Sequence, residues 1–196
     1  MPTSHALALA VALLVVAAAP ARADGFVTPF YGYNYGGDSS NCATLTSCED
    51  KRTNLGISFG TMGAIFGFEE DIAWAKDFFG KVPNADNSVF TMMSNLLIGA
   101  GAGPVQPYFL VGTGLIRPHA SFDISRISKG RNALGYNIGA GVNGYFSRHV
   151  GIRGDVRRLH TLQDVDVPLL GNIASQIFSP QKLDFWRASI GLALKY

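Results

Sequence analysis

The chain has 196 residues, of which 47% are hydrophobic and 15% are charged, and its formal net charge is +2. Soluble domains usually carry about 25% charged residues, so this composition disfavours an ordinary soluble enzyme. A charge this close to neutral gives no reason to expect a nucleic-acid partner.

The first 23 residues are typical of a secretory signal peptide. An apolar stretch over residues 6–19 leads into the sequence Pro-Ala-Arg-Ala at 20–23, which matches a small-residue cleavage site. We therefore predict cleavage near Asp24, export from the cytoplasm, and one domain over residues 24–196.

The chain has two cysteines, Cys42 and Cys48. An exported protein meets oxidising surroundings, so we predict that they form a disulfide that closes a short loop. The alternative, a metal or redox pair, is disfavoured because no histidine is near and the spacing is not Cys-x-x-Cys.

Beyond residue 24 the chain alternates apolar with polar or small residues, the pattern of a strand with two different faces. The last segment shows this most strictly, with Trp186, Ile190 and Tyr196 on one face and Arg187 on the other. Aromatic residues at both ends of an apolar face are typical of a strand that faces lipid. No apolar run after the N-terminus is long enough for a membrane helix. The predicted strands cover 26–37, 52–61, 65–79, 88–99, 105–117, 133–146, 150–160 and 185–196; the inward and outward faces of 88–99 stay undecided, because both are apolar.

The links between these strands alternate in length. Longer links cover 38–51, 80–87, 118–131 and 162–184, and tight links lie near residues 63, 102 and 148. Outer-membrane barrels have long loops outside and short periplasmic turns. We therefore predict an all-β fold: a single eight-stranded antiparallel up-and-down transmembrane β-barrel, which satisfies every backbone hydrogen bond within lipid.

Several segments carry a resemblance to a known family. They are Pro29-Phe30-Tyr31-Gly32-Tyr33, Gly67-Phe68-Glu69-Glu70-Asp71, Pro107-Tyr108, Gly151-x-Arg153-Gly154-Asp155-Val156-Arg157 and the final Tyr196. The chain resembles the eight-stranded outer-membrane β-barrel proteins related to the membrane domain of outer-membrane protein A. The resemblance implies a bacterial outer-membrane location, contact with the lipid bilayer and lipopolysaccharide, and recognition of Tyr196 by the barrel-assembly machinery. The resemblance implies no cofactor, no metal and no catalytic residue.

The alternation places seven charged side chains on the inward faces. The interior of an eight-stranded barrel is just wide enough for side chains to fill, and buried charges are costly unless they are paired. We predict a polar network that closes the barrel; the alternative for the same residues is a narrow, low-conductance ion path. The residues are Glu69, Asp71, Asp77, Arg153, Asp155, Arg157 and Arg187.

A third possibility is an enzyme that modifies lipid A. His119 and Ser121 lie at the predicted outer end of one strand, and His160 lies near Asp164 and Asp166 at that of another. A histidine and a hydroxyl oriented by a carboxylate are the minimum for nucleophilic catalysis. The spacing is unspecific, however, so we predict a non-enzymatic protein with structural and surface-contact roles through loops 38–51 and 162–184. A soluble periplasmic barrel around an apolar ligand is a further alternative.

Overall fold

The computed structural model describes residues 24–39, 49–81, 85–100, 103–122, 127–130, 132–163, 165–168 and 178–196. The predicted signal peptide and both cysteines therefore lie outside the described residues. The strands are β1 (Asp24–Tyr35), β2 (Thr53–Met62), β3 (Phe66–Lys76), β4 (Ala85–Gly99), β5 (Val105–Phe122), β6 (Ile127–Gly130), β7 (Ala133–Tyr145), β8 (Val150–Thr161), β9 (Val165–Pro168), β10 (Phe178–Gln181) and β11 (Asp184–Lys195).

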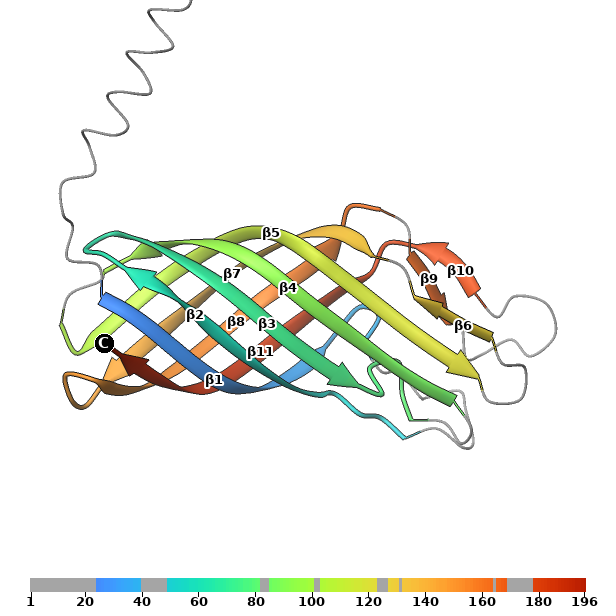
Figure 1. Ribbon diagram of the computed structural model, residues 1–196, viewed down its shortest axis with the longest axis horizontal. Helices are drawn as coiled ribbons and strands as arrows, with labels where there is room; N and C mark the ends of the chain where they lie inside the picture. The colour runs from blue at the N-terminus through green and yellow to red at the C-terminus, as the bar shows by residue number, and fades with distance from the viewer. Residues whose placement is uncertain are drawn as a thin grey trace, which may run out of the picture.

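Eight of these strands close into a barrel. Strands β1, β2, β3, β4, β5, β7, β8 and β11 pair in that order, each antiparallel to the next, and β11 pairs back with β1. Figure 1 shows the tilted strands running the length of an elongated barrel. The predicted eight-stranded antiparallel barrel is confirmed. Among the described residues, no helix is long and apolar enough to cross a membrane.

The two faces of each strand differ as the alternation predicts. On β1, Tyr31 and Tyr33 are about half exposed on the outside, whereas Thr28 and Asn34 are buried inside. Apolar residues outside and polar ones inside are the reverse of a soluble barrel and fit a lipid environment. The undecided strand β4 points its odd-numbered residues inward: Val89, Thr91, Met93, Asn95 and Leu97 are buried.

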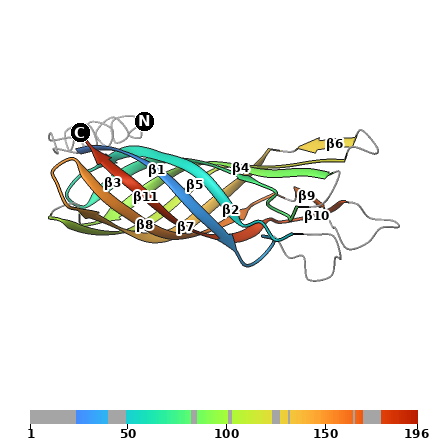
Figure 2. The same ribbon diagram turned by 90° about the horizontal axis from the view of Figure 1, so that it is seen from below.

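Two predicted loops are wrong in part, because they hold regular structure. The segment predicted as a loop over 118–131 begins as a continuation of β5, which runs to Phe122 and pairs with β6. The segment predicted as a loop over 162–184 contains the paired strands β9 and β10. Figures 1 and 2 show these additions at the end of the barrel opposite the C-terminus, where the long links lie.

The interior has three layers. At the end with the long links, an apolar cluster includes Phe78, Phe185 and Leu159. At the end with the termini, a second apolar cluster contains Phe26, Met62, Leu97, Tyr108 and Leu110. Charged and amide side chains lie between the two, so both ends of the polar layer are covered by apolar side chains.

Candidate functional site

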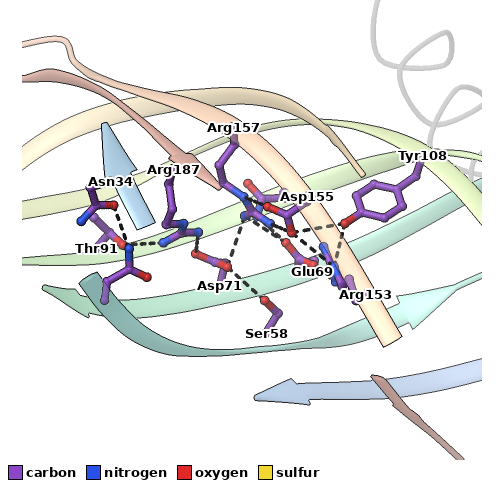
Figure 3. A network of polar contacts seen from close by, with 12 residues as sticks. Asn34, Ser58, Glu69, Asp71, Thr91, Tyr108, Arg153, Asp155, Arg157 and Arg187 are labelled. Atoms are coloured by element: carbon purple, nitrogen blue, oxygen red, sulfur yellow. Dashed lines mark hydrogen bonds and ion pairs between the residues drawn. The ribbon is translucent and has the colours of Figure 1, made fainter. Parts of the chain in front are cut away.

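The polar layer is built from three strands whose alternate residues point inward. Strand β3 contributes Glu69 and Asp71, strand β8 contributes three residues, and β11 contributes Arg187. Figure 3 shows these side chains converging across the lumen. Each is at most 7% exposed: Glu69, Asp71, Arg153, Asp155, Arg157 and Arg187.

Arg157 lies at the centre of the network and contacts all three acids. Its Nη2 lies 2.7 Å from Asp155 Oδ2, and its Nε donates to Asp155 Oδ1 at 3.0 Å. Its Nη1 lies 3.3 Å from Glu69 Oε1 and 3.2 Å from Asp71 Oδ2. One guanidinium, with its five N–H donors in a fixed fork, therefore links strand β8 to strand β3 across the barrel.

Arg153 forms the part of the network closest to the termini. Its Nη1 lies 2.5 Å from Glu69 Oε2, and its Nε donates to the hydroxyl of Tyr108 at 2.7 Å. The Tyr108 hydroxyl in turn donates to Asp155 Oδ2 at 3.3 Å. The guanidinium also lies 5.6 Å from the ring centre of Phe26 and 4.8 Å from that of Tyr108. Cation–π contacts of this kind strengthen when water is excluded, so the charged layer and the apolar cluster beside it are one packed unit.

Arg187 forms the part closest to the long links. It forms a hydrogen-bonded ion pair with Asp71, and its Nη1 lies 3.5 Å from Thr91 Oγ1. Ser58 donates to the other Asp71 oxygen at 3.0 Å. The Arg187 guanidinium lies 5.0 Å from the ring centre of Phe30. Strands β1, β2, β4 and β11 thereby join the same network.

The network is balanced and has room. Three carboxylates face three guanidinium groups, so the layer carries no net formal charge, as burial of ionised groups demands. Glycines on neighbouring strands leave room beside the network, as Gly139 of β7 does next to Arg157 of β8. A Cβ placed on Gly139 would lie 2.6 Å from the Cβ of Arg157, closer than packed carbon atoms approach.

Asp77, the seventh predicted inward charge, belongs elsewhere. Strand β3 ends at Lys76, and Asp77 lies in the following turn with a φ of 56°. Its carboxylate lies 3.6 Å from Lys51 Nζ. The turn also directs Phe78 into the outer apolar cluster, although the alternation had assigned it to the lipid face. Asp77 is therefore buried, as predicted, but does not join the network, whereas the lipid-facing assignment of Phe78 was wrong because period two was continued past the end of the strand.

Little space is left beside Arg187 in the network. A cavity beside Arg187, also lined by Asn34, Asn54 and Thr91, has a volume of only about 10 Å³, about enough for one water molecule. A larger cavity of about 550 Å³ is the mouth at the terminal end, lined by residues such as Asp24 and Lys195. The apolar cluster with Phe26 separates that mouth from Arg153.

The described contacts of the two histidines involve other residues than the expected partners. His160 Nδ1 lies 3.9 Å from Asp184 Oδ2, and that carboxylate is held by Arg158. His119 lies on another strand, paired with Ser88 and Gly130. The side chains of Ser121, Asp164 and Asp166 lie outside what the structure describes. Among the described residues, no three His, Cys, Asp or Glu side chains group as a metal site would.

The outer end is held by contacts between its turns. The carboxylate of Asp38 accepts a hydrogen bond from the backbone N–H of Asp184 at 2.8 Å. Burial raises the pKa of the Asp38 carboxyl above its ordinary value, although that hydrogen bond acts in the opposite direction.

At the other end of the barrel, the backbone N–H of Tyr196 donates to the carbonyl of Gly25 at 2.9 Å, while the Tyr196 side chain is exposed.

Sequence reasoning found the six charges but missed the apolar clusters that enclose them. The signal that could have located the cluster at the end with the long links is the pair Phe78-Phe79, directly before Gly80 and the link over 80–87. The cluster at the end with the termini includes Leu97 of β4, whose inward face was undecided. It also includes Tyr108, which was noted only as part of a motif.

Comparisons with known proteins agree with the geometry. The family described as "Outer membrane protein beta-barrel domain" matches residues 8–194. No curated protein sequence matches the chain. Among solved structures, Neisserial surface protein A is similar with a TM-score of 0.57 and 12% identity over 87% of this chain and 95% of that one. Outer Membrane Protein W of E. coli is similar with a TM-score of 0.53 and 17% identity, covering 89% of this chain and 98% of that one. A third similar structure is that of Ail, the attachment invasion locus protein of Yersinia pestis, in complex with the heparin analogue sucrose octasulfate. Its TM-score is 0.53 and its identity 13%, covering 87% of this chain and 98% of that one.

Proposed function

This chain belongs to the outer-membrane β-barrel proteins, and we propose that within this family it is a non-enzymatic protein that supports the membrane and contacts other surfaces through its extracellular segments. The observation that carries the proposal is the closed interior. Three ion-paired arginines and two apolar clusters fill the lumen of the described barrel. A barrel filled in this way offers its outside and its loops for interaction rather than a path for solutes.

The extracellular end has the elements that surface contact needs. Strands β5 and β6 extend beyond the pairing with β7, and β9 and β10 form a separate sheet in the longest link. Lys76, Arg117 and Lys182 have no ion-pair partner among the residues that the structure describes, and each is exposed. Cations at this end favour anionic groups, and we propose lipopolysaccharide phosphates as their partners in the membrane. Tyr196 at the opposite end is the proposed signal for the assembly machinery.

The test compares the full chain with the triple variant Lys76→Gln, Arg117→Gln and Lys182→Gln. Cells that display each protein are allowed to attach to immobilised heparin, an anionic glycan chosen because the similar Ail structure holds a heparin analogue. Migration of boiled against unheated protein confirms that both barrels are folded. We expect attachment by the full chain and at least a severalfold loss in the triple variant. Equal attachment by both proteins and by cells without them would overturn the contact role.

Two further measurements separate the alternatives. Large steady conductance in a planar bilayer would establish a pore, and closure by the network would then be wrong. A change in lipid A mass that disappears in His119→Ala would establish an enzyme. We expect neither result, because buried side chains occupy the lumen and the Asp184 carboxylate, 3.9 Å from His160 Nδ1, is already bound by Arg158.

A further inference from the structure

Arg187 uses only part of its hydrogen-bonding capacity within the charged layer. Its two terminal nitrogens are occupied, since Nη2 forms the ion pair with Asp71 and Nη1 lies 3.5 Å from Thr91 Oγ1. Its Nε has no hydrogen-bond partner in the described part of the chain, although the residue is only 1% exposed. A guanidinium nitrogen can donate but cannot accept. Because a buried donor without an acceptor is costly, we expect an acceptor beside this N–H group.

A second buried polar atom near Arg187 has the complementary deficit. Asn54 on β2 is 4% exposed, and its Nδ2 donates to Asn34 Oδ1 at 2.8 Å. No group among the described residues donates to Asn54 Oδ1. Asn34 in turn lies directly beside Arg187 in the pairing of β1 with β11. Figure 3 shows Asn34 and Thr91 on one side of the Arg187 guanidinium and Asp71 on the other. This part of the lumen therefore holds one donor and one acceptor that do not bond to each other.

Both side chains line the cavity of about 10 Å³ beside Arg187. That volume admits an occupant no larger than one water molecule. An ion does not suit the cavity, because the three carboxylates and three guanidinium groups of the layer already balance and a further buried charge would be uncompensated. The occupant must also accept a hydrogen bond from Arg187 Nε and donate one to Asn54 Oδ1. The opposite walls are apolar and confine it to this position: Ala73, Ala75, Phe78, Val89 and Phe185.

We propose that this cavity is a binding site for a single water molecule, which accepts a hydrogen bond from Arg187 Nε and donates one to Asn54 Oδ1. Two hydrogen bonds are within the range of two to four that internal waters make. The water joins β11 to β2, and the bond between Asn54 and Asn34 extends the connection to β1, which pairs with both strands. The polar network therefore continues, through one bound solvent molecule, to the place where the first and last strands of the barrel meet.

The first test detects the water in the unchanged chain. The barrel is labelled with heavy nitrogen and placed in phospholipid nanodiscs, and the arginine Nε–H signals are assigned through bonds by NMR. Magnetisation transfer from water is then recorded in the rotating frame, where the sign of the signal separates contact with a bound water from proton exchange. We expect a contact signal at Arg187 Nε–H and none at Arg157, whose Nε already donates to Asp155 Oδ1 at 3.0 Å.

Two results of this test would overturn the proposal. The absence of a contact signal at Arg187 would show that no ordered water lies beside its Nε. Equal signals at Arg157 and Arg187 would show that water fills the charged layer as a whole, which would favour the narrow ion path over a single site.

The second test identifies the acceptor. Asn54→Leu replaces the amide with an apolar side chain of similar size and leaves the water with one hydrogen bond, so we expect the contact signal at Arg187 to fall severalfold. Asn137→Leu is the matched control, because Asn137 is also a fully buried asparagine but does not line the cavity. Thr91→Val removes a neighbouring hydroxyl whose own proton exchanges with solvent, and the signal should persist there as well.

Three outcomes of the second test would refute the proposed site. An unchanged signal in Asn54→Leu would show that Asn54 does not hold the water. An equal fall in Asn137→Leu would indicate a general loosening of the interior, and loss of the signal in Thr91→Val would assign it to the threonine hydroxyl.

Discussion

Glu69 and Glu70 are consecutive acids on one strand, and their environments are opposite. Glu69 is fully buried and contacts Arg153, Arg157 and Asn95 Nδ2, the last at 2.9 Å. Glu70 faces outward and has Ser94 as a partner, with its second oxygen unsatisfied. The side-chain chemistry is the same, so the strand's period of two alone decides the role of each acid. The inner acid holds the barrel together, and the outer one is a polar group in an apolar surface.

The largest expected effect comes from removal of the inner acid. Glu69→Leu leaves Arg153 and Arg157 with fewer counter-charges in a buried layer, and breaking a buried pair typically costs about 3–5 kcal/mol. We expect a loss of that size in the free energy of unfolding, measured by urea titration of barrels in vesicles. In the double variant Glu69→Leu with Arg153→Met, the loss should be smaller than the sum of the two single losses, because both partners are removed. A loss below about 1 kcal/mol in Glu69→Leu would show that the network does not stabilise the barrel.

The next effect tests whether the interior is filled. Gly139→Ala places a methyl group against Arg157 and the carbonyl oxygen of Val156, at 2.6 Å and 2.4 Å in the unrelaxed structure. Overpacking of this kind costs about 1–3 kcal/mol, and we expect a lower urea midpoint. Gly154→Ala is the control, since its nearest contact would be at 3.9 Å on the outer face. Equal tolerance of both substitutions would mean that the lumen has spare room, which would favour the pore alternative.

These residues also show what a sequence can and cannot reveal about such a fold. Glu69, Asp71, Arg153 and Arg157 were assigned correctly because a strand turns every second residue to the same side, a rule that needs no tertiary information. Asp77 is buried but was assigned to the wrong set of partners, because the strand end depends on a positive φ, which the residue pattern does not mark. The partners of each charge could not be predicted either, because they depend on strand tilt and register across the lumen.

Strand β4 illustrates a different limit. Its apolar residues occupy both faces, since Val89, Met93 and Leu97 fill the two interior clusters while Met92 and Leu96 face outward. Alternation is informative only where the interior is polar, and β4 crosses all three interior layers. The extension of β5 past residue 117 was missed for a related reason: outside the membrane no lipid face is needed, so the apolar pattern stops although pairing with β6 continues.

A smaller effect is expected from a neutral member of the network. Ser58→Ala removes the hydrogen bond to Asp71 Oδ2, while Arg157 and Arg187 still hold that carboxylate. Hydrogen bonds to charged groups contribute about 1.5–3 kcal/mol, and the remaining partners place the expected loss near the lower value. The measurement is the same urea titration. A loss as large as that of Glu69→Leu would mean that Ser58 supports the packing of β2 rather than one carboxylate.

The smallest effect has the opposite sign. Glu70→Leu removes a partly unsatisfied polar group from the lipid face, where charged side chains cost up to about 2–4 kcal/mol for Lys or Arg and less for acids. We expect a gain of about 1 kcal/mol in the free energy of unfolding, measured by the same urea titration. In a Ser94→Ala background the gain should be larger, because Glu70 there has already lost its hydrogen-bond donor. If Glu70→Leu instead lowered the free energy of unfolding, the Ser94–Glu70 hydrogen bond would stabilise the pairing of β3 with β4. Glu70 would then resemble Glu69 in holding strands together, and the contrast between the two acids would be one of degree only.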